Sequence, residues 1–138
     1  MNVDYDGITA EITHLLDEAL PEVEVTAEPA VVGAISPLEI GVYLVTDQTE
    51  ESSLGMDDPY SVTLLYSLLC AAFSPDGVGA AATARGGLVN RAKEALKANR
   101  LINGKALTSQ IGRIDFESAE TDAGFFAAAR IDFKVFIQ

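Results

Sequence analysis

The chain has 138 residues, of which 49% are hydrophobic and 22% are charged, as expected for one globular domain. Its formal net charge of −12 argues against a protein that wraps DNA or RNA, because basic surface supplies most of that affinity. No apolar run reaches the ~18 residues of a membrane-spanning helix, and the acidic start of the sequence is unlike a signal peptide. We therefore expect a soluble protein that is made in the cytoplasm and stays there or is built into a particle.

The charges are divided unevenly along the chain. Residues 1–84 contain fifteen acids and no base, whereas residues 85–138 contain all nine bases and six acids. The first segment therefore carries a formal charge of −15 and the second a charge of +3. If the acidic part of one copy meets the basic part of the next, copies join head to tail into a ring or a filament. The alternative is that the acidity only keeps the protein in solution.

The first part of the sequence predicts a helix, two strands and a loop. Residues 5–20 carry apolar side chains at the spacing of an amphipathic helix, which Pro21 ends. Alternating acidic and apolar residues predict a short strand over 22–28, and a similar alternation predicts a longer strand over 38–46. Residues 47–59 are polar and acidic without a period, so we expect a long, mobile acidic loop there.

The middle of the sequence predicts a long strand followed by a helix. Residues 60–73 are apolar at both odd and even positions, which fits either a buried helix or a central strand covered on both faces. A long strand that leads into the next helix is the simpler interpretation. Ser74 and Pro75 are typical of the N-cap and first position of a helix, and residues 80–99 continue with an apolar stripe. Asn103-Gly104 then predicts a turn.

The last part predicts a β-hairpin, and the whole order predicts the fold class. Residues 112–117 and 127–137 alternate between apolar and charged positions, with a turn expected over 118–124. We therefore predict an α+β fold that forms one domain over residues 1–138. Its mostly antiparallel sheet has four or five strands, with the N-terminal helix and the central helix packed on one face.

The residues needed for common catalytic and metal sites are scarce. His14 is the only histidine and Cys70 the only cysteine. A serine triad would therefore have to use His14 as its base, and a zinc site would lack the several Cys or His ligands that it needs. Cys70 lies in an apolar run and is expected to be a small core residue. A divalent cation could bind Glu50, Asp57 and Asp58, although the spacing is not that of a calcium loop. We therefore predict that the protein is not an enzyme and that it has no catalytic residue, no cofactor and no metal.

The order of these patterns resembles a known family. A short amphipathic helix over 8–20 ends in Leu-Pro, and a strand over 38–46 follows an irregular segment. Residues 60–73 lead through Ser-Pro-Asp into the helix over 80–99, and the chain closes on residues 111–116 and 127–137. In these respects the chain resembles the tail terminator (tail completion) proteins of tailed bacteriophages and their relatives in contractile injection systems.

The resemblance implies a structural part of a virion. It implies a ring, expected to be a hexamer, that caps the tail tube, ends its polymerisation and joins it to the head-side connector. The expected partners are other copies of the chain, the tail-tube protein and the connector protein. DNA would pass through an acidic lumen without being bound. The alternative function is a small acidic binding or adaptor protein, such as an immunity protein or a nucleic-acid mimic.

The charge division also suggests interface residues. We expect five bases to donate to acids of a neighbouring copy, and four acids in or beside the predicted loop to face a neighbour or the lumen. The alternative is that each of these nine residues is only a solvated surface charge. The bases are Arg85, Arg91, Arg113, Arg130 and Lys134, and the acids are Glu50, Glu51, Asp57 and Asp58.

Overall fold

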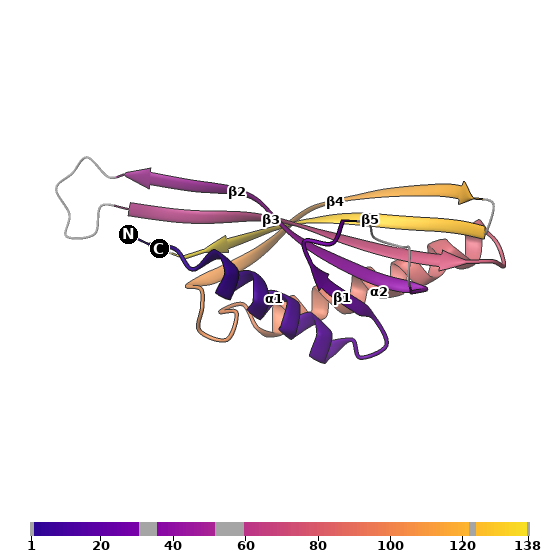
Figure 1. Cartoon of the computed structure of the whole chain (residues 1–138), viewed down its shortest axis with the longest axis horizontal. Helices are drawn as coiled ribbons and strands as arrows, with labels where there is room; N and C mark the ends of the chain where they lie inside the picture. The colour runs from indigo at the N-terminus through magenta and orange to yellow at the C-terminus, as the bar shows by residue number, and fades with distance from the viewer. Residues whose placement is uncertain (1, 31–35, 52–59, 122–123, 138) are drawn as a thin grey trace.

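A computed structural model describes residues 2–30, 36–51, 60–121 and 124–137. In this part, two helices cover one face of a five-stranded sheet (Figure 1). The elements in chain order are α1 (Tyr5–Ala19), β1 (Glu24–Ala27), β2 (Leu38–Glu51), β3 (Tyr60–Ser74), α2 (Val78–Ala98), β4 (Thr108–Thr121) and β5 (Gly124–Phe136).

The strands lie in the order β1-β2-β3-β5-β4. Every neighbouring pair is antiparallel except β1 and β2, which run parallel. Helix α1 contacts β1 and β2, whereas α2 contacts β3, β5 and β4, and the two helices contact each other. The predicted α+β class is therefore confirmed, with a mostly antiparallel sheet and both helices on one face.

Helix α1 forms where its apolar period predicts it. The Asp4 carboxylate caps its first turn by accepting from the Gly7 amide at 3.0 Å. Ile8, Ile12 and Leu16 are buried against the sheet. The helix ends at Ala19, two residues before the proline that cannot continue it.

Strand β3 is the centre of the molecule. Its even-numbered side chains, such as Leu64, Tyr66 and Leu68, are buried under the helices. It pairs with β2 along one edge and with β5 along the other. The prediction of a long central strand over 60–73 is confirmed, with Ser74 added at its end. The expected burial of both faces is wrong, because odd-numbered residues such as Leu65 and Leu69 are only half-buried where no helix covers them.

The prediction of a loop over 47–59 is wrong at its start. Strand β2 continues to Glu51, and Asp47 pairs with Leu64. A β-bulge makes this possible, because Leu44 faces Tyr66 whereas Thr46 already faces the next partner along β3. The strongly apolar β3 therefore extends a polar partner strand that local propensity does not support. The remaining loop positions, 52–59, lie outside the described residues.

A hydrogen-bonded contact ties the extended part of β2 to the first turn of α1. The Tyr5 hydroxyl and the Thr49 hydroxyl both donate to the Asp47 carboxylate. These bonds, chiefly that of Thr49, lower the pKa of Asp47 below its usual 3.8. The stabilisation is thus complete above that usual pKa and is lost as the pH falls through the lower pKa of the folded protein.

Helix α2 begins later than the Ser-Pro pair predicts. Ser74 is the last residue of β3, held there by its pairing with Phe125, and its hydroxyl accepts from the Asp76 amide at 3.1 Å. Gly77, at a φ of 140°, is the N-cap instead. The helix itself agrees with the predicted one over 80–99, and it buries its apolar stripe against the sheet.

The hairpin of β4 and β5 is confirmed, but its turn is shorter than predicted. Residues 118–121 belong to β4, and Gly124 already begins β5. Gly124 has a φ of 150°, and a Cβ atom there would lie 2.8 Å from the Phe73 ring. A glycine is therefore required at this end of the hairpin.

We expect the buried contact between Tyr66 and Thr9 to couple α1 to β3. Their hydroxyl groups lie 2.8 Å apart, and both residues are buried. Tyr66→Phe should lower the free energy of unfolding by about 1–2 kcal/mol, because it leaves the Thr9 hydroxyl without its partner. Urea unfolding of Tyr66→Phe, of Thr9→Val and of the double variant that combines them measures these losses in free energy of unfolding. The double variant should lose less than the sum of the single losses, whereas simple additivity would contradict the coupling.

Candidate functional site

The face of the sheet opposite the helices carries a groove. Its floor and walls come from the odd-numbered residues of β3 together with outward-facing residues of β2 and β5. The cavity has a volume of about 560 Å³. It is lined by Tyr43, Val45, Leu65, Tyr66, Ser67, Leu69, Arg130, Asp132, Phe133 and Lys134.

The apolar part of the groove comes from the two-sided character of β3. Leu65 and Leu69 point away from the helices and are only half-buried. Val45, the extra residue of the β2 bulge, is 63% exposed beside them. The groove therefore has an apolar floor that is partly open to solvent.

One wall of the groove is fixed by a tyrosine. The Tyr43 hydroxyl donates to the Pro29 carbonyl at 2.7 Å, which holds the ring against the chain that follows β1. Burial, and then the nearby charge of Glu28, raise the pKa of Tyr43 above its usual value. Tyr43 therefore stays neutral at physiological pH and offers an apolar surface to a ligand.

The charged rim of the groove lies on β5. Arg130, Asp132 and Lys134 alternate along this strand and share the outer face. None of the three forms an ion pair with another residue in the described ranges. The structure thus brings together two of the bases that the sequence suggested for an interface.

The other three predicted interface bases have partners within the chain. Arg85 donates to the Glu117 carbonyl at 2.7 Å and lies over the Phe116 ring. Arg91 forms a salt bridge with Glu22, which joins α2 to the segment after α1. A neighbouring copy could bind these bases only if their contacts within the chain were broken or shared.

Arg113 bonds Asp115 on its own strand at 2.8 Å, although both side chains remain largely exposed. Of the predicted interface acids, Glu50 is exposed near the end of β2. Glu51 closes that strand, and Asp57 and Asp58 lie outside the described residues. Among the residues that the structure describes, the predicted bases and Glu50 are therefore not brought together as a single site.

A second, smaller hollow was not predicted from the sequence. It has a volume of about 260 Å³ and lies between the C-terminal end of α2 and the edge strand β4. Lys97 and Arg100 stand at its border. The sequence contains no sign of this hollow, because no local pattern shows that β4 returns beside the end of α2. The lining residues are Leu96, Lys97, Arg100, Ser109, Gln110, Ile111 and Phe133.

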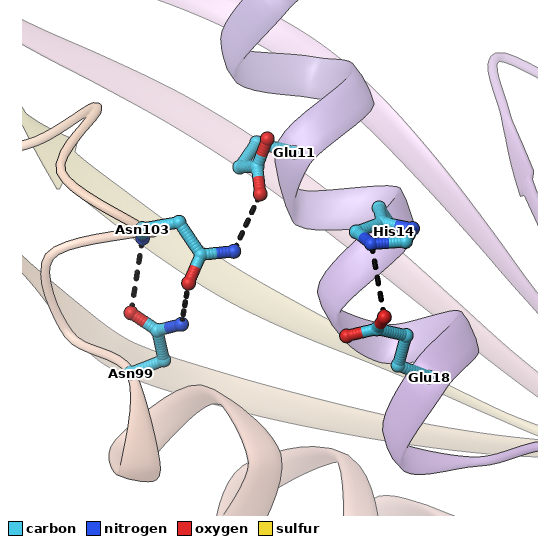
Figure 2. Close-up of polar contacts among 5 residues, drawn as sticks. All are labelled: Glu11, His14, Glu18, Asn99 and Asn103. Atoms are coloured by element: carbon cyan, nitrogen blue, oxygen red, sulfur yellow. Dashed lines mark hydrogen bonds and ion pairs between the residues drawn. The ribbon is translucent and has the colours of Figure 1, made fainter.

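The side chains best suited to acid–base chemistry serve structural contacts (Figure 2). His14 pairs with Glu18 at 3.1 Å one turn along α1, and both are well exposed. Beside them, the side-chain amide of Asn103 donates to the Glu11 carboxylate. The backbone amide of Asn103 donates to the side-chain oxygen of Asn99 at 3.0 Å. These bonds hold the turn after α2 against α1. Neither network borders one of the cavities described above.

The described part of the chain contains no group of three or more His, Cys, Asp or Glu side chains arranged to hold a metal ion. Neither helix in that part has the length and apolar character needed to cross a membrane.

No protein-family model matches the sequence, and a comparison with curated proteins finds no match.

We expect Cys70 to behave as an inert core residue. It is fully buried on β3, and burial raises the pKa of its thiol from 9.0 to about 12. At pH 8 the folded protein should react with a thiol reagent such as iodoacetamide at least tenfold more slowly than the urea-unfolded protein, because the thiolate is scarce and shielded. Equal rates in the two states would show that Cys70 is accessible.

Proposed function

We propose that this chain is a structural ring subunit of a phage tail, as its resemblance to tail terminators implies. In this role it caps the tail tube, ends tube polymerisation and offers a surface to the head-side connector. The observation that supports it best is the way in which the sheet order separates charge. Assembly, rather than catalysis, is then the work of the molecule.

The separation arises because a strand without any charged residue lies between two oppositely charged halves. Strand β3 contains neither acid nor base. Helix α1, β1 and β2 lie toward one edge, and residues 1–28 alone contain eight acids and no base. Helix α2 contacts the strands of the other half, and residues 85–107 contain six bases and one acid. Two different surfaces of opposite sign favour head-to-tail contact between copies.

The same arrangement suits a channel through which DNA passes. Figure 1 shows the paired ends of β2 and β3 projecting beyond the helices. The end of β2 is formed by Glu50 and Glu51. In the proposed ring, such acidic ends face the channel, where they repel phosphate groups and keep DNA from sticking.

A second candidate function is that of a small acidic binding or adaptor protein. The groove on the outer face favours it, because its apolar floor and charged rim can receive a segment of one partner. This candidate requires a one-to-one complex and no ring. The two candidates therefore differ in the mass of the assembly.

We expect the purified protein to form a closed oligomer of fixed size at low salt. Native mass spectrometry at about 50 mM ammonium acetate should show one dominant multiple of the 14.6 kDa chain. Raising the salt to about 500 mM should shift the population toward the monomer, because screening weakens contacts between exposed charges. A chain that stays monomeric at every salt and protein concentration, and does not bind purified tail tubes, would contradict the proposal.

A further inference from the structure

The turn that joins α2 to β4 combines unpaired cations with exposed leucines. Lys97, Arg100 and Lys105 are exposed and form no ion pair with any residue that the structure describes. Leu101 is 54% exposed and Leu107 is 62% exposed in the same turn. We name these five residues the basic patch. It adjoins the smaller hollow, which Lys97 and Arg100 border.

The turn is held rigidly, so the basic patch is preformed. Ile102 is fully buried beneath it, and the Ala106 amide donates to the Leu101 carbonyl at 2.9 Å. Asn103 adds its bond to Glu11 of α1 (Figure 2). A rigid turn that exposes apolar side chains among cations loses little conformational entropy on binding, which favours a docking role.

Exposed residues of α1 and of the edge strand β1 carry the complementary charge. Asp6 and Asp17 on α1 and Glu24 on the edge strand β1 are exposed. They make no ion pair or hydrogen bond with another described side chain. We name these three residues the acidic flank. Glu24 lies on β1 and the smaller hollow borders β4, and these are the two edge strands of the sheet. Helix α1 packs beside α2, and its Glu11 contacts the turn within the chain, whereas the three residues of the acidic flank make no such contact.

We infer that the basic patch is the surface onto which a second copy of this chain docks its acidic flank. The inference rests on the proposed ring and names the residues of its contact. The other six bases fit this role less well, because three have partners within the chain and two lie on the outer face of the sheet. The sixth, Lys93, is half-buried on α2. Carboxylates meeting the cations beside exposed leucines would provide both charge pairing and apolar burial.

Two charge-reversed variants test the inference. The first is Lys97→Glu with Arg100→Glu, and the second is Asp17→Lys with Glu24→Lys. Each variant alone should associate at least tenfold more weakly than the wild type in sedimentation velocity, because like charges then meet across the contact. A matched control for the second variant is Asp76→Lys with Glu120→Lys, which makes the same change in net charge at exposed positions outside both surfaces and should associate like the wild type.

Mixing the variants gives the sharper result. Each retains one unaltered surface, and the reversed surfaces of the two variants are themselves complementary. The mixture should therefore recover association that neither variant shows alone. The expected product contains the two variants in equal amounts, as native mass spectrometry can resolve from their different masses.

The outcomes separate this inference from the proposed ring. If the wild type forms rings and the Lys97/Arg100 variant forms them equally well, the inference fails and the ring remains. If neither variant associates and their mixture does not either, the pairing of these two surfaces is wrong. A wild type that is monomeric under all conditions and does not bind purified tail tubes would overturn both the inference and the ring.

Discussion

The structure depends on one uncharged strand that is apolar on both faces. The even-numbered residues of β3, such as Leu64 and Leu68, are buried beneath the two helices. Its odd-numbered residues, such as Leu65 and Leu69, form the floor of the outer groove. Burying the first set fixes the fold, since the removal of apolar surface from water is the main force that opposes conformational entropy. The second set remains partly uncovered on the outer face of the sheet.

Periodicity alone predicted much of the fold. The apolar repeat of α1, the alternation of β5 and the two-sided character of β3 each indicated the correct element. The errors fall where tertiary pairing overrides local preference. Asp47 lies in β2 because β3 extends beside it, and Ser74 remains in β3 because it pairs with Phe125 rather than capping α2.

The candidate site was only partly predictable. The charge division was visible in the sequence, and Arg130 and Lys134 do share one face with the groove. The partners of Arg85 and Arg91 were not visible, because Glu117 and Glu22 are far from them in sequence. The insertion of β5 between β3 and β4 also cannot be deduced from alternation. It makes β4 the edge strand opposite β1, so that strands from the acidic and the basic parts of the sequence lie toward different edges of the sheet.

The most direct test of head-to-tail docking is zero-length carbodiimide cross-linking of a mixture of ¹⁴N-labelled and ¹⁵N-labelled copies. This reagent couples a carboxylate to an amine only where the two already touch. The account predicts mixed-isotope peptide pairs that join Asp17 or Glu24 of one copy to Lys97 or Lys105 of another. Mixed-isotope pairs that join other surfaces, or links found only within single copies, would contradict it.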